Sequence, residues 1–303
     1  MQLSEELSQY AQSNNLQGFC PHTLSALQSG RYSIEKVQAF RRFYQRIEND
    51  LLKHDIIQRN DYCAWFQRGE FDTAQLRDFI VQFSVFSNQF LVAQLHKMLN
   101  AESIEEMRAS KEILANEIGV IFSGEKPKEV QDKDLEGDPD VVSIDGSIDG
   151  GKFRFRAAHF EWLLRIGEQL ELGFNDMGKR QHGWDGTLFF CDELIRLYGS
   201  EHYHTAAAAS YAVENWAAAG FWDQLVEGLV KFKSNINMPH LPIAFFTWHS
   251  RIEANHAQHT KDELEEHYFT HQVDEDKFIR DGNEMLDGVK VFWEGLERNR
   301  LGH

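Results

Sequence analysis

Three side chains in the last quarter of the sequence have the types and spacing of metal ligands. His249, Glu253 and His256 form the pattern H-x-x-x-E-x-x-H. On a helix each residue advances by about 100°, so Glu253 lies about 40° to one side of His249 and His256 about 20° to the other. Two neutral imidazoles and a carboxylate on one face suit iron, manganese or zinc, and open coordination positions favour non-haem iron. The alternative is a chance pairing in a chain that contains 14 histidines.

Further candidate ligands lie earlier in the chain, in or beside segments that read as helix. Glu214 follows the run 205–213, which consists almost wholly of small and apolar residues. A carboxylate on such a face is costly unless a cation or hydrogen bonds compensate it, and the alternative is an exposed helix edge. Glu117 lies near the end of one predicted helix and His159 begins another. Either of these two residues alone is a weak signal.

The order of these residues resembles the ligand order of the haem-oxygenase-like diiron oxidases and oxygenases. That order is Glu, His and Glu, followed by the motif at positions 249–256. Three flanking segments are also similar to that family, namely residues 116–119, 159–173 and 76–86. The resemblance covers roughly residues 50–298. Two departures are a longer spacer between Glu117 and His159 and the presence of Glu253 where relatives often have aspartate.

The resemblance implies an all-α fold, a haem-oxygenase-like seven-helix bundle of the kind found in thiaminase-II-like proteins and pyrroloquinoline-quinone synthase. It implies two Fe(II) ions, with iron or manganese in the isolated protein, and O2 as cosubstrate. The implied metal ligands are Glu117, His159, Glu214, His249, Glu253 and His256. Relatives convert amino acids, amines or fatty acids by N-oxygenation, C–C cleavage or oxidative decarboxylation. An external electron donor is compatible with this chemistry, and a homodimer is common among relatives.

Two other functions remain open. A metal-free enzyme on the same fold, of the thiaminase-II or quinone-cofactor type, would need a different reactive group, and Cys191 is the candidate thiol. A non-catalytic helical binding protein would need no ligands at all. Six candidate ligands in the family's order argue against the latter.

The segments that carry these residues are predicted to be helices. Apolar residues recur at three- and four-residue spacing, which predicts helices over residues 62–67, 73–99, 105–122, 160–172, 186–197, 202–219, 222–233, 243–259 and 274–298. Asp72 or Thr73 and Ser103 are the expected N-caps of two of them. Residues 1–50 are predicted to be an N-terminal helical extension packed on a main domain of residues 51–303. Residues 123–151 are polar and acidic, and read as a long surface insertion.

Aromatic and basic residues near the predicted site bear on the substrate. The aromatic side chains at 79, 83, 86, 90, 245, 246 and 248 either line a pocket or pack the core, and packing is the more common role. A carboxylate substrate would need a cation, but Arg251 lies about 200° from His249 on the helix. Arg156 and Arg165 are closer to His159, and neither is a clear anchor.

The composition of the chain indicates which binding partners and which cellular compartment to expect. The chain has 303 residues and a formal net charge of −17 at pH 7, which argues against nucleic acid and anionic membranes as partners. No run approaches the roughly 18 apolar residues of a membrane span, and no secretory signal is visible at the N-terminus. The three cysteines form no paired motif, which fits a reducing compartment. A cytoplasmic enzyme with a small-molecule substrate is expected.

Overall fold

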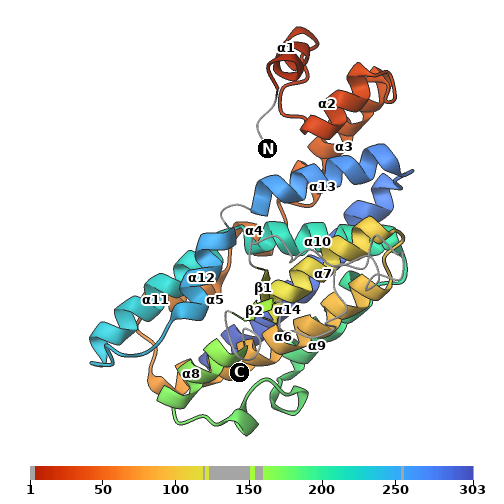
Figure 1. The fold of residues 1–303 in the computed structure, drawn as a ribbon. Coiled ribbons are helices and arrows are strands. Elements are labelled where there is room, and N and C mark those ends of the chain that lie inside the picture. Colours follow the sequence, from red (N-terminus) through yellow and green to blue (C-terminus); the bar gives the residue numbers. More distant parts are fainter. Residues whose placement is uncertain (1–3, 119, 123–150, 154–159, 254–255, 303) are drawn as a thin grey trace, which may run out of the picture.

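The computed structural model describes residues 4–118, 120–122, 151–153, 160–253 and 256–302. Within these ranges the regular secondary structure is helical apart from one short antiparallel ladder, so the all-α class predicted from the sequence is confirmed (Figure 1). The helices are α1 (Glu5–Ser13), α2 (Pro21–Gln28), α3 (Ile34–Asp50), α4 (Asp55–Gln58), α5 (Asp61–Phe66), α6 (Thr73–Leu99), α7 (Ile104–Glu117), α8 (Phe160–Gln169), α9 (Asp185–Glu193), α10 (Tyr203–Ala217), α11 (Phe221–Asn235), α12 (Ala244–Glu253), α13 (His256–Thr270) and α14 (Glu275–Leu301). The strands are β1 (Val120–Phe122) and β2 (Gly151–Phe153).

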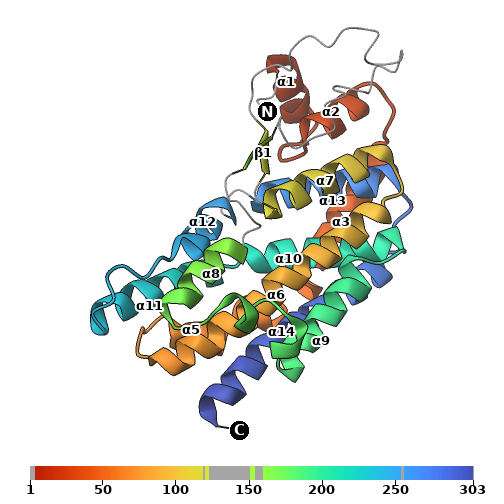
Figure 2. The same ribbon diagram turned by 60° about the horizontal axis from the view of Figure 1, so that its bottom comes forward.

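The bundle is built around the two longest helices. In Figure 1, α6 and α14 run diagonally through the molecule, and α14 packs on α9 and α10 while α6 packs on α7, α8 and α9. Helix α13 packs on α10, and α7 lies on the same side of the bundle, as Figure 2 shows. Helices α5, α8, α11 and α12 gather at the opposite end of the bundle.

Helix α6 forms where the sequence predicts it because its start is capped and one face is apolar. The Asp72 carboxylate accepts a hydrogen bond from the Gln75 backbone N–H at 2.8 Å, and the Gln75 side chain accepts one from the Asp72 N–H at 3.0 Å. This reciprocal pair satisfies two of the N–H groups that a helix start leaves without a helical partner. Phe79 and Phe83 on the apolar face are fully buried.

The aromatic residues of α6 and α12 form the core. Phe79 stacks on Phe246 with ring centroids 5.9 Å apart, and Phe83 meets Trp222 edge to face at 5.7 Å. Phe245 and Phe246 are themselves buried. These side chains therefore pack the interior of the bundle, in line with the more common of their two expected roles.

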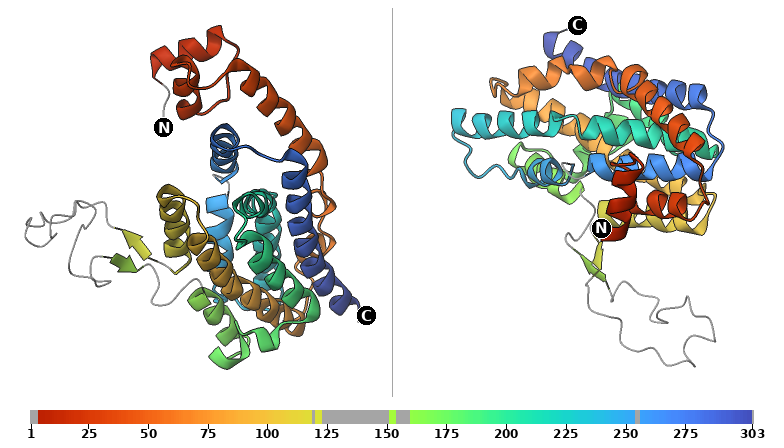
Figure 3. Two further views of the ribbon diagram at one scale, coloured as in Figure 1. Left: turned by 90° about the vertical axis from the view of Figure 1, so that its right-hand side faces the viewer. Right: turned by 90° about the horizontal axis from the view of Figure 1, so that it is seen from above.

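The N-terminal segment contains three helices. Ser4, Cys20 and Ser33 cap α1, α2 and α3, each accepting a hydrogen bond from a backbone N–H of its helix. Figure 3 shows α1 and α2 at one end of the molecule, joined to the bundle through α3. From α3, Phe43 stacks on Tyr268 of α13 at 5.3 Å. The division of the chain at residue 50 stays a prediction.

Two predicted helices differ from the structure. The helix expected over 105–122 ends at Glu117, and Val120–Phe122 instead pairs with Gly151–Phe153 in the register Val120↔Phe153. The residues of β1 are β-branched or aromatic and find their partner strand across the acidic segment, a pairing that local periodicity cannot show. The helix expected over 243–259 is two helices, α12 and α13, which differ in direction in Figure 1. They pack on different neighbours, α12 on α8 and α11, and α13 on α2, α3 and α10. The expected surface insertion lies almost wholly outside the described residues.

Candidate active site

Three of the six predicted ligands have side chains that the structure describes. Glu117 is the last residue of α7, and Glu214 lies in the last turn of α10; both are half-buried. His249 lies in α12 and is only 8% exposed. By themselves these three do not form a metal site, since no cluster of three His, Cys, Asp or Glu suited to a metal ion occurs within the described ranges.

The other three predicted ligands cannot be placed at the level of their side chains. Glu253 ends α12 and His256 begins α13, so their backbone positions are described. His159 lies outside the described residues, directly before Phe160, the first residue of α8. His249 and Glu253 share α12, so an advance of about 100° per residue relates their positions. His256 belongs to a separate helix, α13, so the same advance does not relate it to His249.

His249 has the local geometry of a metal-binding histidine. Its Nδ1 lies 2.7 Å from the carbonyl oxygen of Phe245, one turn earlier in α12. A carbonyl oxygen can only accept, so Nδ1 carries the hydrogen of this contact. The ring stacks on Trp222, with centroids 4.6 Å apart and planes 17° from parallel. Metal-binding histidines commonly donate their second N–H to a carbonyl in this way, which sets the tautomer and the ring orientation.

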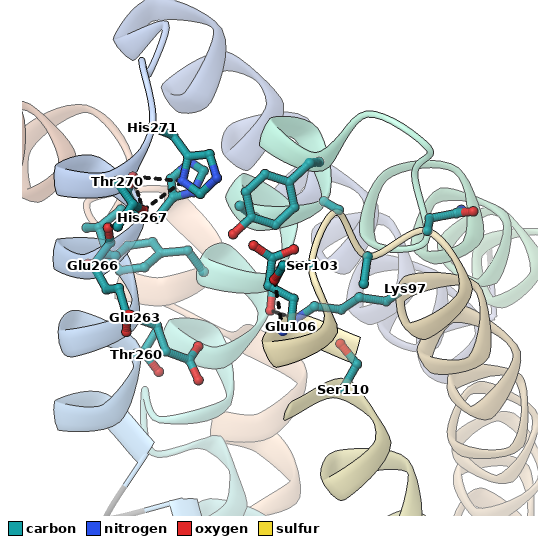
Figure 4. A pocket seen from close by; sticks show the side chains of 18 of the residues that line it. Lys97, Ser103, Glu106, Ser110, Thr260, Glu263, Glu266, His267, Thr270 and His271 are labelled. Carbon is teal, nitrogen blue, oxygen red and sulfur yellow. Dashed lines mark hydrogen bonds between the residues drawn. The ribbon is translucent and has the colours of Figure 1, made fainter. Parts of the chain in front are cut away.

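A cavity of about 430 Å³ lies between the end of α6 and the helices α7, α10 and α13 (Figure 4). Its size falls in the range of small-molecule binding sites. Its polar lining is made by Lys97, Asn100, Ser103, Glu106, Ser110, Tyr203, Ser210, Tyr211, Thr260, Glu263, Glu266, His267, Thr270 and His271. Its apolar lining is made by Ala101, Ile113, Ala206, Ala207, Leu264 and Phe278. The aromatic residues of the α6 core stripe do not contribute to it.

The helices around the cavity run in defined directions. At one end, Tyr203 at the start of α10 meets the rings of His267 and His271 near the end of α13, with centroids 5.1 and 5.0 Å apart. Tyr203 also hydrogen-bonds Glu106, near the start of α7. Figure 4 shows Ser110 and Thr260 at the opposite end. Helices α7 and α10 therefore run along the cavity in one sense and α13 in the other.

The lining faces of these three helices lead towards the predicted ligands. In α7 the lining positions are 103, 106, 110 and 113, and one turn further along that face is Glu117. In α10 the face through 207, 210 and 211 reaches Glu214. In α13 the face through 267, 263 and 260 reaches position 256. Side chains three or four residues apart share a helix face, so all three positions fall at the same end of the cavity.

Lys97 lines the cavity and interacts electrostatically with Glu214. Its Nζ lies 2.6 Å from the Ser210 hydroxyl and 4.7 Å from the centre of the Tyr198 ring. The Tyr198 ring belongs to a π-helical turn, Leu194–Tyr198, that follows α9. Burial lowers the pKa of Lys97, and nearby carboxylates oppose this shift. Those carboxylates belong to Glu263, Glu214 and Glu106.

Lys97 is the cation of this region and was not predicted from the sequence. Of the predicted candidates, Arg251 is exposed in α12, and Arg165 pairs with Glu161 at 2.7 Å. Arg156 lies outside the described residues. Lys97 follows Phe90 and Ala93 at helical spacing in α6, so a lysine that continues the inward stripe was the available signal.

A group of histidines at the far end of the cavity was also missed. His204 Nδ1 and His267 Nε2 lie 3.3 Å apart, and the His267 and His271 rings stack at 5.0 Å. His267 is 6% exposed, and its Nδ1 has no hydrogen-bond partner. Burial, and then the neighbouring His271 and His204, lower the pKa of His267 to about 3. This ring is therefore neutral at physiological pH.

The cysteines do not have the environment of a nucleophile. Cys191 is fully buried, and burial raises its pKa to about 12. Cys63 is also fully buried, with a pKa raised well above its usual value by the same cause. A reactive thiol needs partial exposure and a lowered pKa, so the structure does not support Cys191 in that role.

Comparison with known proteins adds no relative. No protein-family model matches the chain, and no curated protein matches its sequence. In the described part of the chain, no helix has both the length and the apolar character needed to cross a membrane.

Proposed function

We propose that the protein is an O2-activating non-haem diiron oxidase or oxygenase with a haem-oxygenase-like bundle. Its substrate would be a small organic molecule, an amino acid, amine or fatty acid. The proposal is supported by the direction of three lining faces, which one helical turn beyond Ile113, Ser210 and Thr260 reach Glu117, Glu214 and position 256. A cavity that leads to a set of converging ligand positions is the arrangement that a metal-dependent oxidase needs.

The packing around α12 supports the remaining ligands. Trp162 in the first turn of α8 meets Trp248 of α12 edge to face, with centroids 5.8 Å apart. The start of α8, which directly follows His159, therefore lies beside the turn that carries His249. The hydrogen bond from His249 Nδ1 to the Phe245 carbonyl fixes the orientation in which the ring would present Nε2 to a metal.

The donor set fits two ferrous ions. Three carboxylates and three neutral imidazoles offset most of the charge of two divalent cations, so the centre could lie in an apolar bundle without a severe desolvation cost. Nitrogen and oxygen donors of this kind suit iron, with manganese as the alternative occupant. When bound, the two ions would supply the electrons with which O2 is reduced.

The protein's own side chains would orient the ligands and exclude water. The Phe245 carbonyl holds the His249 ring in one tautomer, and Trp222 covers one face of that ring. Phe245 and Phe246 close the core next to it. The cavity would hold the substrate on the side of the ligand positions that faces away from these aromatic residues. A dry, pre-oriented site of this kind is the usual contribution of a protein to metal chemistry.

Iron binding tests the proposal. Protein loaded anaerobically with Fe(II) and desalted should retain about two iron atoms per chain by elemental analysis, and O2 should then produce a transient visible absorption band. His249→Ala and His256→Ala should lower the iron content while leaving the helical circular dichroism unchanged. His240→Ala, which removes an exposed histidine, is the matched control and should bind iron normally. Protein that stays iron-free after loading, or full iron content in both ligand variants, would contradict the proposal.

A further inference from the structure

The cavity has an excess of negative charge. Three carboxylates line it, those of Glu106, Glu263 and Glu266. Among the described lining residues, Lys97 is the single lysine or arginine. Because the His267 ring is neutral, three carboxylates against one ammonium leave a net charge of about two negative units from these groups.

Lys97 is already engaged within the protein. Its ammonium lies 2.6 Å from the Ser210 hydroxyl, and the Tyr198 ring covers it at 4.7 Å. Carboxylates surround it, including that of Glu214 beyond the cavity. A carboxylate ligand would have to approach this ammonium through a negative field, so Lys97 is poorly placed to anchor one.

The position of the carboxylates suits a ligand with one charged end. Glu106 lies at the end of the cavity formed by Tyr203 and His267, and Glu263 lies along its wall. The apolar part of the wall includes Ile113 of α7, Ala207 of α10 and Leu264 of α13. A chain held at Glu106 or Glu263 would extend along this apolar wall towards Glu117 and Glu214.

We propose that the cavity binds a protonated primary amine carried on a short apolar chain, with Glu106 and Glu263 as its counter-charges. The overall charge of −17 reinforces this preference, since an acidic protein concentrates small cations at its surface. The identification of this ligand as the substrate rests on the proposed diiron function. The binding itself does not, because every group it uses lies outside the predicted ligand set.

Four compounds of equal chain length test the charge preference. Isothermal titration calorimetry of the iron-free full-length chain at low salt would compare hexylamine, hexanoate, 6-aminohexanoate and hexanol. Hexylamine should bind with 1:1 stoichiometry and more tightly than the other three, and added salt should weaken it. Absence of hexylamine binding, or tighter binding of hexanoate or 6-aminohexanoate, would overturn the proposal.

Charge-neutralising variants test the site. Glu263→Gln and Glu106→Gln should each weaken hexylamine binding by roughly three- to tenfold, the effect of one charge at a partly solvated site. Glu294→Gln is the matched control, because position 294 lies sixteen residues, about 24 Å of helix, beyond Phe278 in α14. Lys97→Met should strengthen hexylamine binding. Unchanged affinity in both glutamate variants, or loss of amine binding in the lysine variant, would refute the assignment.

The two proposals fail in different ways. Iron content is measured without ligand, and amine binding is measured without iron. Protein that takes up no iron on anaerobic loading but binds hexylamine would refute the diiron function and keep the amine site. Protein that binds two irons but not hexylamine would do the reverse.

Discussion

Replacing His267 should remove part of the protein's sensitivity to acid. The ring is 6% exposed and is surrounded by His204 and Tyr203 from α10 and by His271 from its own helix. These surroundings lower its pKa from 6.5 to about 3. The unfolded chain therefore takes up a proton at this position below pH 6.5, whereas the folded protein does not until about pH 3.

The size of the effect follows from the shift. Because folding lowers the pKa of this base, the contribution of His267 to the free energy of unfolding is fully present above pH 6.5 and falls as the pH decreases. Each pH unit below 6.5 costs about 1.4 kcal/mol of unfolding free energy, so the loss at pH 5 is about 2 kcal/mol from this residue alone. At pH 4 it reaches about 3 kcal/mol, a large part of the stability of a typical domain.

Urea unfolding at pH 7, 6 and 5 would measure this loss. His267→Gln should be less stable than wild type at pH 7, because the packing and the contact with His204 change. Its further loss between pH 7 and pH 5 should be about 2 kcal/mol smaller than that of wild type. His240→Gln removes an exposed histidine and should keep the wild-type pH dependence. Equal pH dependence in wild type and His267→Gln would refute the reasoning.

Three further predictions concern other parts of the bundle. Gly228→Ala should destabilise the fold by about 2 kcal/mol in denaturant unfolding, because the added Cβ would collide with the backbone carbonyl of Phe66 where α11 crosses α5. Asp72→Ala should cost about 1 kcal/mol by the same assay through loss of the α6 cap, with no change in iron content. Burial raises the pKa of Glu265, so its stabilising contribution is present below pH 4.5 and is lost as the pH rises through the raised pKa. Glu265→Gln should therefore gain stability relative to wild type between pH 5 and pH 8, and a constant difference across that range would contradict the assignment.

Much of the fold was predictable because its signals are local. The start of α6 at Thr73 follows from the Asp72 and Gln75 capping pair, and its length follows from the aromatic stripe. Periodicity failed where contacts distant in sequence decide the conformation. Val120–Phe122 pairs with Gly151–Phe153, and α12 and α13 separate because they pack on different helices.

In the candidate site, too, features within one helix were predictable from the sequence, and features that depend on the packing of several helices were not. The relation of His249 to Glu253 is a property of one helix and was readable from a spacing of four. The approach of α7, α10 and α13 to one cavity was not readable, because it depends on the relative directions of three helices. Lys97 and His267 were missed for this reason, since each has its role only through contacts with α10.

The sequence by itself determined the helical class, the main caps and the excess of negative charge, because each depends on residues close together in the chain or on composition alone. The tertiary structure decided where that charge acts. Glu106 and Glu263 lie far apart in sequence, and they reach the same cavity as Lys97 because α7 packs on α6 and α13 packs on α10. The charge distribution of the cavity therefore depends on helix directions. These directions are determined by contacts spread over the whole core and not by a short sequence motif.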